Sequence, residues 1–201
     1  YHAYSELKRL AGELLGLEEV PAKGSVLWEG EGDVDVSMMP PAMPGVASRL
    51  LHDRHLGVFV GDARPESVAA VKAALHNKFV EKAHLMDRMS MVSDPQVRLQ
   101  LLRACASARP GFWLRTMSPA VTADAAAWYD VRMRDCLSNI LAAAPMPAMS
   151  WDVATLPCRL GGLGITPAHA SRNHAYYASW AASWHNMTRM FPHAITIPPN
   201  E

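Results

Sequence analysis

The residues of this chain best suited to chemistry are cations placed beside glycine-marked turns. Lys23 follows the segment Gly16–Ala22, in which a glycine ends one element and a proline precedes the next. Arg159 lies within Leu156–Ile165, which reads Leu-Pro-Cys-Arg-Leu-Gly-Gly-Leu-Gly-Ile. A positive donor held at such a turn stabilises charge on phosphate oxygens. Without further context Lys23 is also simply an exposed loop lysine, so its chemistry depends on its surroundings.

A second set of cations lies between these two segments. Lys72, Lys78 and Lys82 fall on one long stretch with helical spacing, and Arg98 and Arg103 fall on the next. Such side chains are suited to contact a nucleic-acid backbone without reading its sequence. The alternative for each of them is an ordinary solvated surface residue.

The charge distribution is uneven although the net charge is zero. Residues 1–62 carry five Lys/Arg against ten Asp/Glu, and residues 63–201 carry fourteen against nine. A basic C-terminal part favours a phosphate-bearing partner. Chance imbalance on an ordinary surface gives the same counts, so both interpretations stay open.

Composition excludes several classes of protein. Half of the 201 residues are hydrophobic and 19% are charged, which is typical of one sizeable globular domain or two small ones. No apolar run approaches the roughly 20 residues of a membrane span, and the start at Tyr1 resembles an internal cut rather than a signal peptide. Three widely spaced cysteines predict neither disulfides nor a zinc site, which favours an intracellular location in the cytoplasm or nucleus.

No metal site is expected in this chain. The closest histidine pairs are His52 with His55 and His169 with His174, and neither has Cys or carboxylates at a recognisable ligand spacing. Among the tryptophans, Trp113 near Arg115 is the one aromatic–basic pair suited to base stacking. The other close pair, Trp180 and Trp184, is expected to form core or helix–helix contacts.

The N-terminal part predicts a small α/β unit over residues 1–62. Apolar residues spaced by three and four predict a helix over 2–16, ended by Gly16. Alternating patterns around a glycine-rich turn predict a hairpin of strands 24–29 and 34–38. A third short strand, nearly all apolar, is expected at Leu56–Gly61.

The remainder predicts a helical bundle over residues 63–190. Long helices are expected at 63–89 and 118–144, each with a stripe of apolar residues at helical spacing along one face. A shorter helix opens at Asp94-Pro95, and a last one covers 167–190. Arg109-Pro110-Gly111 interrupts the pattern, and residues 191–201 form a proline-rich tail. The expected fold class is therefore α+β and mostly α.

Taken in order, the glycine-marked segments resemble the C-terminal palm and thumb of a non-LTR retrotransposon-type reverse transcriptase. Gly16-Leu17 followed by Lys23 resembles polymerase motif D, although Val20 stands where the family usually has Asn. Leu56–Gly61 (Leu-Gly-Val-Phe-Val-Gly) resembles the motif E strand, or primer grip. Leu156–Ile165 resembles a recurring string downstream of the thumb.

The resemblance implies roles for particular residues. Lys23 would be the general acid near the leaving pyrophosphate, and Gly57 and Gly61 would lie beside the primer terminus. The thumb would dock on an RNA/DNA template–primer duplex. The candidate nucleic-acid contacts on it are Lys72, Lys78, Lys82, Arg98, Arg103 and Arg159.

The resemblance also implies what this piece lacks. The carboxylates that bind Mg²⁺ would precede Tyr1, so no cofactor is expected here and this piece alone would not polymerise. Its partners would be the duplex and the remaining palm and fingers, with no membrane. The alternative is a non-catalytic helical interaction module from a decayed or domesticated element.

Overall fold

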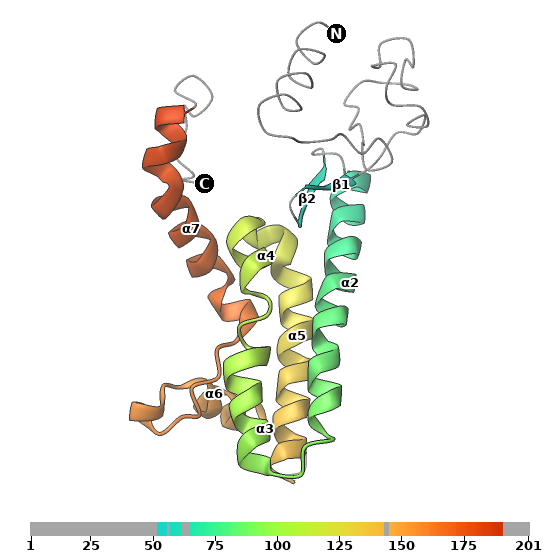
Figure 1. Ribbon diagram of the computed structural model, residues 1–201, viewed down its shortest axis with the longest axis vertical. Coiled ribbons are helices and arrows are strands. Elements are labelled where there is room, and N and C mark those ends of the chain that lie inside the picture. The colour runs from blue at the N-terminus through green and yellow to red at the C-terminus, as the bar shows by residue number, and fades with distance from the viewer. Residues whose placement is uncertain (1–51, 56, 62–64, 143–144, 191–201) are drawn as a thin grey trace, which may run out of the picture.

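A computed structural model describes residues 52–55, 57–61, 65–142 and 145–190 (Figure 1). This part of the chain is mostly helical, as expected. The expected helix over 2–16, the hairpin over 24–38 and the tail over 191–201 lie outside the described residues, as does Lys23. The helical elements are α2 (Pro65–Met89), α3 (Pro95–Leu101), the π-helical turn η3 (Leu102–Ala106), α4 (Gly111–Thr116), α5 (Pro119–Ile140), α6 (Ala148–Thr155), the 3₁₀ turn η4 (Cys158–Leu160) and α7 (Ala168–Met190).

Two short strands form an antiparallel hairpin ahead of the helices. β1 (His52–His55) pairs with β2 (Val58–Gly61), with His55 opposite Val58. Gly57 lies in the connecting turn with φ +89°, a conformation that glycine adopts without strain. The expected strand at Leu56–Gly61 therefore begins two residues later, at Val58. Its first glycine makes the turn instead of lying in the strand.

Three helical segments build the core (Figure 1). α2 and α5 run in the same direction, and α3 with η3, which lies between them in the sequence, runs the opposite way on the other side of α5 from α2 in this view. The apolar stripe predicted on α2 is buried, with Leu75 fully inaccessible and Phe79 1% exposed. It packs against the stripe on α5, where Met133 and Leu137 are fully buried. Helical periodicity in the sequence thus located the main interface correctly.

The start of α3 follows the predicted capping chemistry. Oδ1 of Asp94 accepts hydrogen bonds from the backbone N–H of Gln96 at 2.8 Å and of Val97 at 3.4 Å. Pro95 occupies the first helical position, where it has no N–H to leave unsatisfied. The predicted N-terminus of this helix is confirmed.

The C-terminal elements leave the bundle axis. α6 and η4 lie beside the lower end of the bundle, and α7 rises past α4 (Figure 1). Within α7 the one fully buried side chain is that of Ala168. None of the described helices is both long enough and apolar enough to cross a membrane.

Candidate nucleic-acid interface

The hairpin is fixed to the helical bundle by a buried tryptophan. Nε1 of Trp113, on α4, donates a hydrogen bond to the carbonyl oxygen of Gly57 at 3.2 Å. Phe59 from β2 is 9% exposed and joins the core, and the ring centroids of Phe79 and Trp113 lie 5.7 Å apart. Trp113 is itself 6% exposed, so its indole anchors the hairpin and is not free to stack on a base.

The three candidate lysines of α2 do not form one stripe. Nζ of Lys72 lies 3.3 Å from Oδ2 of Asp124 on α5. Lys82 turns toward α4 instead, with its Nζ 5.9 Å from the centroid of the Trp113 ring. Lys72 and Lys82 therefore lie on opposite flanks of the buried face of α2.

Lys78 is paired within its own helix. Its Nζ lies 2.7 Å from Oε1 of Glu81, one turn away. Pairs of this kind on a surface contribute little stability, about 0–1 kcal/mol. Lys78 and Lys72 are thus already paired with carboxylates, but a phosphate could displace either partner at small cost.

The glycine-rich segment forms a compact loop that caps α6. The N–H of Leu163 donates to the carbonyl of Ala154 at 3.0 Å, and the N–H of Gly164 donates to the carbonyl of Leu156 at 2.9 Å. Both carbonyls belong to the end of α6, where intrahelical partners run out. Ile165 is 1% exposed and ties the loop to the core. Leu156–Ile165 therefore has a structural role that its sequence did not reveal.

The glycines of this loop are each required by geometry. Gly161 and Gly164 have φ of +83° and +67°, the left-handed region expected from the sequence. At Gly162 an added Cβ would lie 2.1 Å from the carbonyl oxygen of Leu156, closer than any real contact. Only glycine allows the loop to approach the backbone so closely.

The loop also positions one candidate arginine. A Cβ added at Gly164 would lie 3.2 Å from Nε of Arg103 and 3.3 Å from Sγ of Cys158. The Arg103 guanidinium therefore lies against the loop, at the edge of a hollow of about 350 Å³ that Thr155 and Thr166 also line. Arg159, on η4, is exposed. Of the candidate cations, Arg103 and Arg159 are thus the two exposed ones that lie at or beside this loop.

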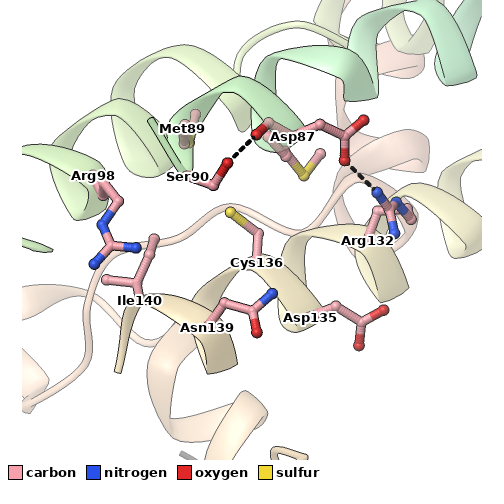
Figure 2. Close-up of a pocket in the computed structure, with 10 residues that line it drawn as sticks. Asp87, Met89, Ser90, Arg98, Arg132, Asp135, Cys136, Asn139 and Ile140 are labelled. Atoms are coloured by element: carbon pink, nitrogen blue, oxygen red, sulfur yellow. Dashed lines mark hydrogen bonds and ion pairs between the residues drawn. The ribbon is translucent and has the colours of Figure 1, made fainter. Parts of the chain in front are cut away.

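Arg98 lies elsewhere, in a pocket between the C-terminal end of α2, α3 and α5 (Figure 2). It shares this pocket with Arg132, which binds Asp87 with 2.6 Å between Nη2 and Oδ1. The pKa of the Cys136 thiol is raised here, because the effect of burial exceeds the opposing effect of the positive charges of Arg132 and Arg98. The candidate cations thus occupy at least three separate places on the molecule and do not converge on one site.

A half-buried carboxylate that the sequence did not single out holds the start of α7. Asp130, on α5, accepts hydrogen bonds from the N–H groups of Ala168 at 2.7 Å and His169 at 3.0 Å. Burial raises the pKa of Asp130, and the two hydrogen bonds lower it by a smaller amount. The partners are 38 and 39 residues apart, so no local pattern could have predicted the contact.

Comparison with known proteins adds no relative. No family model, curated protein or solved structure matches this chain. Among the described residues, no group of three or more His, Cys, Asp or Glu side chains is arranged to hold a metal ion. The geometry above and the resemblance of the glycine-marked segments are therefore the two grounds on which a function can be proposed for this chain.

Proposed function

We propose that this chain is the palm–thumb end of a reverse transcriptase-type polymerase and that its described part holds a template–primer duplex through phosphates. The observation that carries the proposal is the docking of the β1–β2 hairpin on the bundle through Trp113 and Gly57. A primer grip followed by a thumb needs a glycine-turned hairpin held rigidly on a helical bundle. The order of elements along the chain supports the same assignment.

The proposed mechanism is positioning rather than catalysis by this part of the chain. The exposed cations Arg103 and Arg159 contact phosphates directly, and Lys82 does so from the flank beside the hairpin. Phosphate contacts fix the register of a duplex but carry no sequence information. Two parts of the proposal rest on the resemblance alone. They are the role of Lys23 as the general acid and the binding of Mg²⁺ by the complete polymerase.

Binding of a labelled RNA–DNA hybrid at several salt concentrations tests this function. If three to five phosphates are neutralised, log K falls with log salt at a slope of roughly −3 to −4. Replacing Arg103 and Arg159 together by Gln should weaken binding equally for unrelated sequences and flatten the slope by about 1–2. Arg88→Gln, on the exposed side of α2, is the control: it removes one charge outside the proposed set, and its effect on the slope is compared with the effect per charge of the double variant. Absence of binding by the folded chain at low salt would reject the proposal.

A second candidate is the non-catalytic interaction module. The specific observation in its favour is that Lys72 and Lys78 are already paired with Asp124 and Glu81. A module of this kind would show no salt-dependent affinity for duplexes. The same titration therefore separates the two functions.

A further inference from the structure

The pocket around Arg98 has the two-sided lining of a small-molecule site (Figure 2). Its volume is about 290 Å³, close to the lower end of typical ligand pockets. Buried apolar side chains, including those of Met86, Met89 and Ile140, line one side. Polar groups from α3 and α5 form its rim. A ligand here would have a polar end and a short apolar part.

Arg98 is the unusual member of this lining. Its Nε is shielded from solvent and has no hydrogen-bond acceptor among the described residues. The structure also gives its guanidinium no ion pair in this part of the chain. A buried donor of this kind carries a desolvation cost until an acceptor reaches it. The guanidinium lines the pocket, so an anion bound there would pair with a cation that has no carboxylate partner among the described residues.

The other charges of the pocket leave Arg98 as the cation available to a ligand. Arg132 forms an ion pair with Asp87, with 2.6 Å between Nη2 and Oδ1. Asp135 is exposed, and Figure 2 shows it on the Arg132 side of the pocket, away from Arg98. The side chains of Cys136 and Asn139 lie between the two arginines.

The directions of these donors favour one ligand chemistry. Arg98 approaches from α3, whereas Arg132 and Asn139 approach from α5 on the other side (Figure 2). A planar carboxylate presents its two oxygens to one side, but a tetrahedral phosphate presents oxygens in several directions at once. We propose that this pocket binds the phosphate group of a small phosphate ester, with Arg98 as its principal donor. This goes beyond the proposed function, since a pocket set between three helices is poorly placed for the backbone of a duplex.

Titration of the full chain with inorganic phosphate and with glycerol 3-phosphate at constant ionic strength tests the site. The Arg98 side-chain ¹H–¹⁵N correlation is followed by NMR, with acetate and chloride as comparison anions. Both phosphate probes should shift this signal in the millimolar range, the ester binding at least as tightly as the free ion. Arg98→Gln should weaken phosphate binding at least tenfold and Arg98→Lys to an intermediate degree. Arg189→Gln, which removes an exposed arginine of α7 that has no proposed role in binding, should change it less than twofold.

The variant Asp135→Asn tests the same site independently, because it should change phosphate affinity in the opposite direction. Removing this negative charge should tighten phosphate binding twofold to fivefold, without touching the proposed donor. A short duplex with 5′-phosphate ends, compared with the same duplex with 5′-hydroxyl ends, distinguishes a free ester from a nucleic-acid terminus as the source of the group. Equal effects of Arg98→Gln and Arg189→Gln, or equal shifts with acetate and phosphate, would overturn the proposal. Loss of duplex binding with phosphate binding intact would instead reject the polymerase function alone.

Discussion

At the scale of single residues, Tyr129 is the most constrained polar side chain of the core. It is fully buried, and its hydroxyl donates to the carbonyl of Ala106, at the end of η3, across 3.0 Å. Its ring also packs edge-on against Phe79, with 5.7 Å between centroids. Burial, as the main cause, raises the pKa of Tyr129 from 10.0 to about 12.

This raised pKa predicts an alkaline loss of stability. The folded state keeps the Tyr129 proton while the unfolded state loses it, so this contribution is fully present below pH 10 and disappears as the pH approaches 12. Two pKa units correspond to roughly 2–3 kcal/mol. Tyr129→Phe should lower the free energy of unfolding by about 1 kcal/mol at neutral pH. It should also remove the fall in stability at alkaline pH, so the stability curves of the wild type and the variant cross at about pH 11. Urea unfolding at several pH values measures this, with the exposed Tyr177→Phe as the control that keeps the slope.

Asp130 predicts a different effect, confined to the start of α7. Asp130→Ala removes two hydrogen bonds to the N–H groups of Ala168 and His169, a loss typical of an N-cap and worth about 1 kcal/mol. Hydrogen exchange in the first turn of α7 should speed up while the middle of α5 stays protected. Asp124→Ala, which removes an exposed carboxylate from the same helix, should change stability by less than about 0.5 kcal/mol. Unchanged exchange at Ala168 would contradict the capping role.

The raised pKa of Asp130 also predicts how the stability difference between the wild type and Asp130→Ala depends on pH. Because burial raises the pKa of Asp130, the folded state binds its proton more readily than the unfolded state. Its contribution to stability is therefore greatest below the ordinary pKa of 3.8 and falls as the pH rises through the folded value. The difference in stability between the wild type and Asp130→Ala should accordingly narrow as the pH rises from acid to neutral.

At the scale of elements, the glycine loop and α4 differ sharply in whether a glycine can be replaced by alanine. Gly162→Ala would place a Cβ 2.1 Å from the Leu156 carbonyl oxygen, which forces the backbone to move. We expect a loss of about 3 kcal/mol. Gly111→Ala would place its Cβ 3.6 Å from Nη2 of Arg115, an ordinary contact on a helix. This control should be neutral or stabilise by up to about 1 kcal/mol; similar unfolding midpoints for the two variants would contradict the proposed fit of the loop.

The elements that could be predicted from the sequence are those whose signals are local. The stripe on α2 and the Asp94-Pro95 cap of α3 repeat or occur within a few residues, so they were recognised. α4 was missed because its six residues span fewer than two helical turns and its first residue is a glycine that follows a proline. α5 ends at Ile140, four residues before the predicted end, and Ala142 beyond it has φ +50°. Nothing in the alanine-rich sequence there indicates where the helix ends.

At the scale of the whole molecule, the candidate site was less predictable than the fold. The sequence identified the cations, but it could not show that Lys72 pairs with α5 while Lys82 faces α4. It suggested Trp113 for base stacking, whereas the folded chain uses its indole to hold the hairpin. The pocket around Arg98 forms only when three separated helices pack together. These properties belong to the tertiary structure, so residue type and spacing alone do not determine them.

The junction between hairpin and bundle gives a whole-molecule prediction that separates positioning from charge. Trp113→Phe removes the hydrogen bond to Gly57 but no charge. If the hairpin aligns a primer end on the bundle, loosening it by about 1 kcal/mol should weaken binding of an RNA–DNA hybrid roughly fivefold. The slope of log K against log salt should stay unchanged, because that slope depends on the number of phosphates neutralised.

Fluorescence anisotropy with a labelled hybrid at three salt concentrations measures both quantities. Trp128→Phe is the matched control, because Trp128 packs edge-on against His76 at 5.0 Å on the flank between α2 and α5, and no hydrogen bond from its indole to the hairpin is present among the described residues. This control should leave affinity and slope as they are, and hydrogen exchange should show faster opening of β2 in Trp113→Phe alone. A changed slope would mean that Trp113→Phe disturbs the cationic surface itself. Unchanged affinity with a loosened hairpin would mean that the hairpin takes no part in holding the duplex, and the primer-grip assignment would then be wrong.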